Sequence, residues 1–427
     1  MRIAAVVTAI SVAVSWGAAV PAGAAEKGSL RAGAAIVDIT PAEETPLPMA
    51  GYAGRERGHQ GVHDRLYVRA IVVDDGSTQA ALVGTDAIFI DDASWETLAP
   101  RIEKETGIPQ NQILLSATHT HAGPNFRRLR GEGSGPGADY LNRFENKVTA
   151  AVRQAQSRLV PARMGFGTGE AHVNMNRRAR LPNGGWWLGV NPDGPSDKTV
   201  AVLKFETFGG EPIALYVNYA VHGTVLGQRN LQISGDLPGA TSRFVEERLG
   251  SDVVVAWTSA AAGDQDPLYR VGDNFDHVDV LGRILGEEVV RVTEGIKTSP
   301  RMRIAGMQRV VTCPGKKNPP GPRRRPELDY QFLDAEPTSI RLSLLLLNHV
   351  AVTGVSGEVL TGINTRLKRE SPLAGTVMVT HANGASGYIP DDAAYDQISY
   401  EIVVSRVKRG CAEDAVVNGL LDMIDSL

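Results

Sequence analysis

Residues 113–124 read Ile-Leu-Leu-Ser-Ala-Thr-His-Thr-His-Ala-Gly-Pro and carry the most information about the fold. The first five residues form a short apolar run that is typical of a buried strand, and the run stops at Thr118-His119-Thr120-His121. Alternate side chains of a strand point to one face, so we expect the rings of His119 and His121 to point in one direction. The stretch predicts a buried strand that ends in a polar site.

Other apolar runs end in the same way, at acidic, glycine or histidine residues. They lie at 70–73, 80–84, 213–221, 253–257, 350–355 and 377–380. Helical spacing of apolar residues occurs at 93–106, 140–159, 239–249, 277–296 and 412–424, whereas 126–139, 181–196 and 312–328 are predicted to be loops. The alternation predicts an α/β fold, a large single domain with mixed β-sheets flanked by helices. Sites in such folds collect beyond the carboxyl ends of strands, where these polar residues fall.

Composition excludes several classes of protein. The chain of 427 residues has 44 Lys+Arg and 48 Asp+Glu, for a net charge of -4, which argues against a nucleic-acid binder that relies on a positive field. Two cysteines are too few for a disulfide scaffold, and their spacing leaves the pairing of Cys313 with Cys411 open.

The amino terminus predicts export. Arg2 precedes an apolar run at 3–14, and Ala22-Gly23-Ala24 fits a cleavage site, so residues 1–24 are expected to be a signal peptide and residues 25–427 the catalytic domain. The alternative is a membrane anchor, but the run is too short to span a bilayer, and we find no later run of about 20 apolar residues. We therefore expect a secreted or extracytoplasmic protein without a transmembrane segment after signal removal.

The histidines at the strand ends suggest a metal. His119, His121, His222 and Glu358 would bring imidazole and carboxylate groups to one site, and these groups are common zinc ligands. The alternative is that the histidines have structural roles.

A resemblance strengthens the metal interpretation. Residues 116–124 resemble the Ser-Ala-Thr-His-Thr-His-x-Gly-Pro motif of the neutral/alkaline (non-lysosomal) ceramidase family. Segments that are similar to the family's sequence follow in the same order at 49–53, 61–70, 174–177, 219–222 and 357–358, with Tyr388 and Tyr400 at the family's spacing. The resemblance covers roughly residues 31–405 and implies the family's catalytic domain.

The resemblance also implies roles for individual residues. The family's zinc ligands (Zn2+) correspond here to His119, His222, Glu358 and Tyr388. The polar groups that hold substrate and stabilise an oxyanion correspond to His121, Arg177 and Tyr400. Two alternatives stay open, namely that Arg177 pairs with a surface carboxylate and that Tyr400 is a core residue of a helix.

The chain departs from the family at the nucleophile. The family has serine in Gly-Asp-x-Ser-Pro, whereas this chain reads Gly263-Asp264-Gln265-Asp266-Pro267. A serine mechanism therefore cannot be carried over. Zinc lowers the pKa of a bound water to about 7, and a carboxylate can accept its proton. We hypothesise that Asp266 is the general base, with Asp264 as the competing candidate; the alternative is that both carboxylates only cap a helix or fix a loop.

A second departure concerns the substrate. Only a short helical segment follows Tyr400, so we expect the family's additional carboxyl-terminal domain to be absent and the substrate to be one that need not be membrane-engaged ceramide. Trp186 and Trp187 offer an aromatic wall that stacks on sugars, covers an acyl chain or simply packs locally.

The resemblance implies a secreted zinc-dependent hydrolase that cleaves an N-acyl amide bond, in a ceramide-like or other N-acyl compound, with zinc-activated water and Asp266 as base. Two alternatives are a hydrolase of a different ester, lactone, amide or glycosidic bond on the same scaffold, and a non-catalytic zinc-holding binding protein. The expected partner is a small-molecule or lipid-like substrate and not a nucleic acid.

Overall fold

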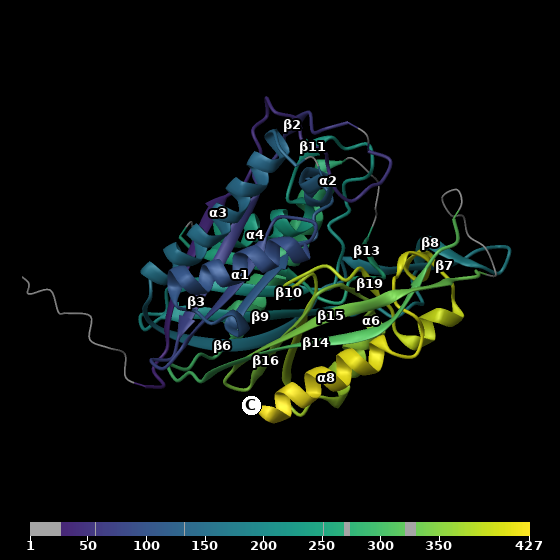
Figure 1. Cartoon of the computed structure of the whole chain (residues 1–427). Coiled ribbons are helices and arrows are strands. Elements are labelled where there is room, and N and C mark those ends of the chain that lie inside the picture. The colour runs from purple at the N-terminus through teal and green to yellow at the C-terminus, as the bar shows by residue number, and fades with distance from the viewer. Residues whose placement is uncertain (1–26, 56, 132, 251, 269–273, 321–329) are drawn as a thin grey trace, which may run out of the picture.

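A computed structural model describes residues 27–55, 57–131, 133–250, 252–268, 274–320 and 330–427 (Figure 1). The predicted signal peptide, residues 1–24, lies outside the described residues. Within the described ranges, no helix combines the length and the apolar character that crossing a membrane requires.

The larger of the two main sheets has eight strands in the order β12-β10-β9-β6-β1-β3-β4-β5. Neighbouring strands are antiparallel except for the parallel pairs β4–β5 and β10–β12. Their bounds are β1 (Arg31–Asp38), β3 (Tyr67–Asp74), β4 (Gln79–Thr85), β5 (Ile113–Ala117), β6 (Val160–Glu170), β9 (Thr199–Thr207), β10 (Pro212–Tyr219) and β12 (Val254–Ser259). Strands β4, β5 and β12 are buried on both faces, which is why they appear in the sequence as continuous apolar runs.

The smaller main sheet has four strands in the order β14-β15-β16-β18. They are β14 (Ile304–Lys317), β15 (Leu333–Leu347), β16 (Val350–Val355) and β18 (Gly375–Val379), with β16 and β18 parallel. Apolar side chains of both sheets form one core between them; it includes Leu82, Tyr216, Leu345 and Val352. The shared core unites the two sheets in one folded body.

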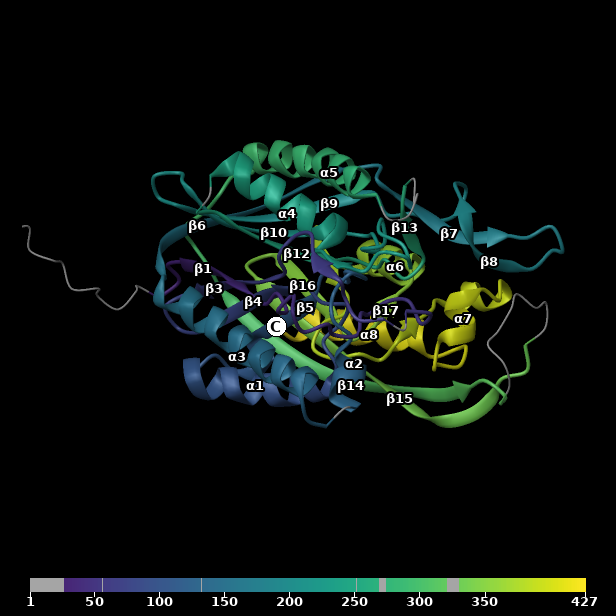
Figure 2. The same cartoon turned by 90° about the horizontal axis from the view of Figure 1, so that it is seen from above.

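Helices cover the outer faces of both sheets, so the molecule has four layers (Figures 1 and 2). The larger sheet is covered by α1 (Asp92–Thr106), α3 (Pro136–Ser157), α4 (Asp236–Leu249) and α5 (Phe275–Gly295). The smaller sheet is covered by α6 (Thr361–Glu370) and α8 (Ala412–Ser426). All five predicted helices are present within a few residues of their predicted ends, and the predicted α/β class is confirmed.

The three predicted loops were wrong in part. Segment 126–139 contains α2 (Phe126–Gly131) and the start of α3, where Pro136 fits because the first turn of a helix needs no N–H donor. Segment 181–196 contains β8 (Trp186–Asn191), which forms a hairpin with β7 (Asn174–Arg180). Strand β14 extends to Lys317, paired with β15, and residues 321–328 lie outside the described part. These strands are largely exposed, so they lack the apolar run that identifies a buried strand.

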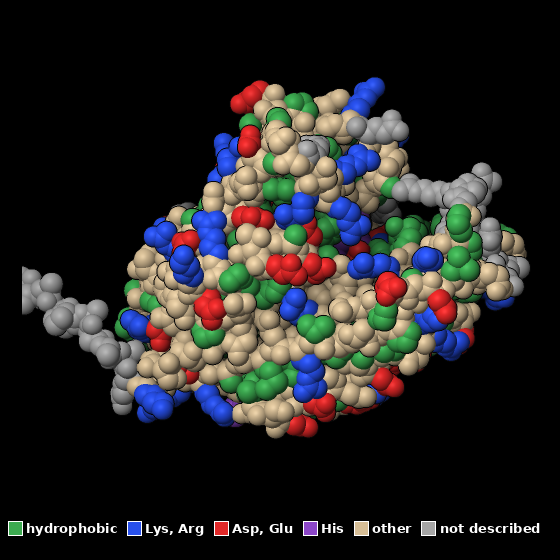
Figure 3. Space-filling model, viewed as in Figure 1, with side chains coloured by type: hydrophobic (Ala, Val, Ile, Leu, Met, Phe, Trp, Pro, Cys, Tyr) green, Lys and Arg blue, Asp and Glu red, His purple; other side chains and the backbone are tan. Residues whose placement is uncertain are grey.

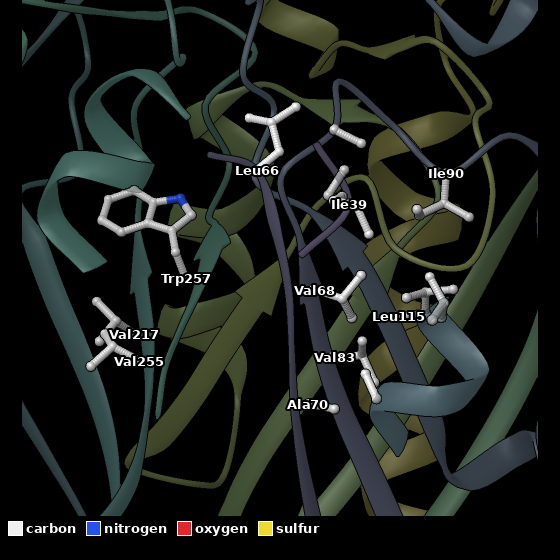
Figure 4. Close-up of a cluster of buried hydrophobic side chains, with 14 of the residues drawn as sticks. Ile39, Leu66, Val68, Ala70, Val83, Ile90, Leu115, Val217, Val255 and Trp257 are labelled. Carbon is white, nitrogen blue, oxygen red and sulfur yellow. The ribbon is translucent and has the colours of Figure 1, made fainter. Parts of the chain in front are cut away.

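The larger sheet curls until β12 packs against β3, β4 and β5. A Cβ atom added to Gly84 of β4 would lie 2.6 Å from the backbone oxygen of Trp257 of β12, so the close approach of the two strands requires glycine. Figure 4 shows side chains from both halves of the sheet in one buried cluster, among them Val217, Val255, Trp257, Val68, Val83 and Leu115.

Residues 380–383, which follow β18 and which we name the closing segment, join the two edges of the curled sheet. On one side, the Thr380 N–H donates to the Ser259 oxygen of β12 at 2.8 Å. On the other, the Ala117 N–H of β5 donates to the His381 oxygen at 3.3 Å, and the Asn383 N–H donates to the Leu115 oxygen at 2.9 Å. The carboxyl ends of β5 and β12 therefore meet at one place.

The structure pairs Cys313 with Cys411 in a disulfide, with the Cα atoms 5.7 Å apart, which answers the question that their spacing left open. The bond ties β14 to the start of α8.

We predict that Gly84→Ala lowers the free energy of unfolding by about 1–3 kcal/mol, because the new methyl group forces β4 and β12 apart. Gly61→Ala is the matched control, since nothing lies within 4 Å of the Cβ position there. Urea unfolding of both variants measures the difference, and equal stabilities would show that the approach of the strands tolerates a side chain.

Candidate metal centre

The loops that follow β5 and β10 lie side by side. The His121 N–H donates to the Gly223 oxygen at 3.1 Å, and Thr120 forms an isolated parallel bridge with Gly223. A Cβ atom on Gly223 would lie 2.8 Å from the backbone oxygen of His119, so only glycine allows this approach. The pairing of the two loops brings His222 to the His119–His121 segment.

Three buried histidines, His119, His121 and His222, form a cluster whose candidate ligand atoms all lie within 4.8 Å of one another. The Nε2 atoms of His119 and His121 are 3.2 Å apart. The rings do not converge for the predicted reason, because both residues lie beyond the end of β5 and His119 has a left-handed backbone, with φ of 63°. A left-handed turn, rather than the alternation of a strand, sets the direction of the two rings.

A carboxylate and a phenol reach the same place from the smaller sheet's side. The short strands β17 (Glu358–Val359) and β19 (Tyr388–Ile389) are parallel, with Glu358 opposite Tyr388. The Oε2 atom of Glu358 lies 3.5 Å from Nε2 of His119 and 3.4 Å from Nε2 of His222. This oxygen is buried, yet it makes no hydrogen bond with any described residue.

Backbone carbonyl oxygens fix the orientation of the His119 and His222 rings through hydrogen bonds that they accept from Nδ1. Nδ1 of His119 donates to the Ile88 oxygen at 2.7 Å, and Nδ1 of His222 donates to the Gln265 oxygen at 3.0 Å. Because a carbonyl only accepts, the proton of each neutral ring is on Nδ1 and the lone pair of Nε2 faces the cluster. This is the arrangement that orients metal-binding histidines in proteins.

The electrostatics of the cluster suit a cation. Burial, reinforced by the charge of Arg177, lowers the pKa of His222 to about 4, and burial together with the neighbouring imidazoles holds the pKa of His121 well below its usual value. Burial favours the neutral form of Glu358, but its contacts with His119 and His222 outweigh burial and hold the pKa of that carboxyl well below the usual range. Metal binding requires deprotonated ligands, and the low pKa values of His121, His222 and Glu358 favour that state.

The spacing of these atoms also fits a metal ion. A tetrahedral zinc with ligand bonds of about 2.0–2.1 Å places its ligand atoms about 3.3 Å apart. The separations of 3.2, 3.5 and 3.4 Å among His119, His121, His222 and Glu358 match that value. Buried nitrogen and oxygen donors at this spacing, one of them a carboxylate oxygen without a hydrogen bond, are suited to a divalent cation.

Arg177 links the candidate ligands to the candidate base. Its strand, β7, pairs with β13 (Gln265–Pro267), and the side chain is buried. The guanidinium donates to Glu401 at 2.7 Å, to Asp266 at 3.1 Å, to the Tyr388 hydroxyl at 2.9 Å and to Nε2 of His222 at 3.2 Å. The alternative that Arg177 pairs with a surface carboxylate was therefore wrong.

Tyr400 begins α7 (Tyr400–Val404) and lies at the edge of the cluster. Its ring makes edge contacts with the rings of Tyr388, at 5.9 Å between centroids, and of Trp187, at 6.0 Å. Burial raises the pKa of Tyr388 well above its usual value, against the opposing effect of Arg177. The β7–β8 hairpin, which extends from the body in Figures 1 and 2, thus contributes an aromatic ring beside the site.

The two aspartates have different surroundings. Asp264 accepts from the hydroxyl of Thr361 at 2.7 Å, from the Thr361 N–H at 3.1 Å and from Asn176 at 3.1 Å, so it anchors the start of α6. Asp266 instead accepts from Arg177, which also contacts the candidate ligands. Asp264 is thus engaged in hydrogen bonds that hold the start of α6, whereas Asp266 lies beside the arginine that also contacts the candidate ligands.

Two residues of the site were missed by the sequence analysis. Glu401 is fully buried and pairs with Arg177; its position next to Tyr400 was the only signal. His381 is buried with its ring stacked on that of His119, at 3.9 Å between centroids and 14° between planes. It lies in the segment before Tyr388, where neither apolar spacing nor a quoted motif identified it.

Figure 3 shows histidine and acidic atoms in a hollow near the places of β13 and β19 in Figure 1, beside hydrophobic and basic side chains. The side chains of His119 and His222 are 2% and 1% exposed, whereas that of Glu358 is 18% exposed. The candidate ligands are therefore largely buried, and Glu358 is the most exposed of these three.

Comparison with solved structures identifies the fold. The structure described as "Ceramidase complexed with C2" superposes with a TM-score of 0.79 at 19% identity, over 93% of this chain and 76% of that one. The neutral ceramidase of Pseudomonas aeruginosa gives a TM-score of 0.78 at 19% identity, over 93% and 74%. The fold is that of the ceramidase hydrolases.

Sequence comparison gives the family. The family model of the neutral/alkaline non-lysosomal ceramidase N-terminal domain matches residues 30–273, more than half of the chain. The chain belongs to this family. The match contains His119, His121, Arg177, His222, Asp264 and Asp266, whereas Glu358, Tyr388 and Tyr400 lie beyond it.

Curated relatives agree with this assignment. Neutral ceramidase B of Dictyostelium discoideum is 30% identical over 264 residues, which are 57% of this chain and 36% of the relative. The neutral ceramidase of Pseudomonas aeruginosa is 29% identical over 253 residues, 56% of this chain and 37% of the relative. The match thus spans about a third of the length of these relatives.

We predict that Asp264→Ala lowers the free energy of unfolding by about 2–3 kcal/mol, because it leaves buried donors of Thr361 and Asn176 without an acceptor. Asp266→Ala is expected to cost no more than about 1 kcal/mol, since Arg177 keeps its pair with Glu401. Urea unfolding measures both values; the reverse order would contradict the roles assigned to the two carboxylates.

Proposed function

We propose that the protein is an exported zinc-dependent hydrolase that cleaves an N-acyl amide bond. The observation that carries the proposal is the buried Oε2 atom of Glu358, which makes no hydrogen bond with the described residues and lies 3.5 and 3.4 Å from the Nε2 atoms of His119 and His222. A buried carboxylate oxygen without a partner is costly unless a cation binds it. The proposed ligands are His119, His222, Glu358 and Tyr388.

His121 is the alternative fourth ligand. Its Nε2 atom lies within the histidine cluster, 3.2 Å from that of His119. We assign His121 to the substrate side because the resemblance places it among the groups that hold substrate, together with Arg177 and Tyr400.

A bound zinc supplies a Lewis acid that polarises a carbonyl and lowers the pKa of water to about 7. In the proposed reaction, Asp266 accepts a proton from the water that attacks the acyl carbon and later donates it to the leaving nitrogen. The new C–O bond replaces the C–N bond, which yields a carboxylic acid and an amine. Tyr400 and His121 are proposed to donate hydrogen bonds to the oxyanion that forms on the acyl oxygen.

Arg177 keeps the proposed base in place. Its guanidinium donates hydrogen bonds to the carboxylates of Asp266 and Glu401, while its bond to the Tyr388 hydroxyl favours the phenolate that a tyrosine ligand needs.

The family supports an N-acyl substrate, since the similar proteins are named ceramidases. Trp187, Tyr400 and Tyr388 form a row of aromatic rings beside the cluster, and such a row covers an acyl chain well. We therefore propose a ceramide-like or other N-acyl, small-molecule or lipid-like substrate. Aspartate at the family's serine position favours a second candidate, which is hydrolysis of a different ester, lactone or glycosidic bond on the same scaffold.

Export remains a proposal from the predicted signal peptide. The disulfide between Cys313 and Cys411 supports it, because disulfides persist in oxidising compartments outside the cytoplasm.

We predict that the purified protein carries about one zinc per chain and that Glu358→Ala weakens zinc binding about 100-fold, because a charged ligand is lost. Inductively coupled plasma mass spectrometry measures the zinc content, and competition with a chelator measures the zinc affinity. Glu287→Ala, whose side chain is 52% exposed on α5, is the matched control. A wild-type protein without stoichiometric zinc would overturn the proposed site.

We predict hydrolysis of at least one N-acyl compound in a panel of ceramides of several acyl lengths, N-acyl amino acids, a lactone and a glycoside. Asp266→Ala is expected to lower kcat by about 100- to 10,000-fold while zinc content stays unchanged. The exposed Asp193→Ala is the control. Unchanged activity of Asp266→Ala would exclude the proposed base, and turnover of only the lactone or glycoside would favour the second candidate.

A further inference from the structure

His381 is a buried histidine that the proposed reaction does not use. It lies in the closing segment, and its ring is stacked on the ring of His119, with 3.9 Å between centroids and 14° between planes. The other rings around His119, those of His121 and His222, meet it edge-on at 86° and 71°. Only the His381 ring lies parallel to that of His119 among the described aromatic contacts.

The backbone of His381 is strained. Its φ is 52°, in the left-handed region where a side chain with Cβ crowds the backbone. The other described non-glycine residues with positive φ are His119, Asp236, Asn348 and Asn383. Both members of the stacked pair therefore have this conformation. Glycine, and occasionally asparagine, are the residues that visit this region routinely, so the backbone conformation does not itself require histidine at this position.

The main-chain contacts of His381 do not require a ring. Its N–H donates to the Gly357 oxygen at 3.2 Å, and its oxygen accepts from the Ala117 N–H at 3.3 Å. Any residue that adopts the same φ makes both bonds. The main-chain hydrogen bonds with which His381 helps to join the sheet edges therefore do not depend on its imidazole ring.

The stack supplies a restraint on the plane of the His119 ring. The bond from Nδ1 of His119 to the Ile88 oxygen fixes one edge of the ring, and the His121 and His222 rings contact it edge-on rather than across its face. A parallel ring at contact distance opposes a tilt of that plane. The direction of Nε2, which faces Glu358 at 3.5 Å, follows from both restraints together.

We propose that His381 is a positioning residue of the metal centre, which acts by fixing the plane of the His119 ring so that Nε2 points at the ion. The proposal rests on the proposed function, since it concerns the affinity of the same site for zinc. It assigns to His381 neither a ligand bond nor contact with substrate.

The test separates metal affinity from stability. His381→Asn removes the ring and relieves the left-handed strain, so we expect zinc affinity to fall about tenfold while the urea midpoint stays equal or rises. His381→Phe keeps a parallel ring and is expected to hold zinc within about threefold of wild type. Affinity is measured by competition with a chromophoric chelator on metal-free full-length protein. His349→Asn, at an exposed position between β15 and β16, is the control.

Each outcome decides one question. Wild type that does not bind zinc would overturn the proposed function and this inference with it. Wild type that binds zinc, with His381→Asn binding equally well, would overturn the inference alone. If His381→Asn and His381→Phe lose stability and affinity in parallel, His381 has only a structural role. Loss of affinity without loss of stability in His381→Asn, recovered in His381→Phe, supports the positioning role.

Discussion

The backbone hydrogen bonds of residues 380–383 hold the two edges of the curled sheet together, and the candidate site depends on them. The loop after β5 carries His119 and the loop after β10 carries His222, while Asp266 follows β12. The sheet order separates β5 from β12 by six strands, so only curling brings these groups together. A segment from the second sheet completes the curl, and Glu358 and Tyr388 reach the centre from that same sheet's side.

Charge balance is the second constraint on this centre. Glu358, Glu401 and Asp266 are all largely buried, and burying carboxylates is costly unless they are paired. Arg177 pairs with Asp266 and Glu401, whereas Glu358 contacts imidazoles, of which His222 has a pKa lowered to about 4 and so offers no countercharge at neutral pH. A divalent cation bound here would supply that charge, so the proposed metal would contribute to the electrostatics of the fold as well as to the proposed reaction.

Apolar runs and helical spacing were enough to predict the α/β class and the helices. The polar residues at strand ends were enough to place His119, His121, His222 and Glu358 in one candidate site. The resemblance added Arg177, Tyr388 and Tyr400, which residue types alone would not identify. The rest depended on information that no local pattern contains. The left-handed turn at His119 and the stack of His381 arise from tertiary contacts. The exposed strands β8 and β14 are held by pairing with a neighbour, without an apolar run of their own.

The closing segment has a consequence for the order of folding. It follows β18, so the edges of the sheet cannot be joined until almost the whole chain is available. Contacts between residues so far apart in sequence form late, because the loop between them must first be closed at an entropic cost. An unfinished or still unfolded chain therefore presents isolated histidines and no assembled set of ligands. Capture of the proposed metal would then be one of the last events in the maturation of this protein, and the compartment in which the chain folds would decide which ion it meets.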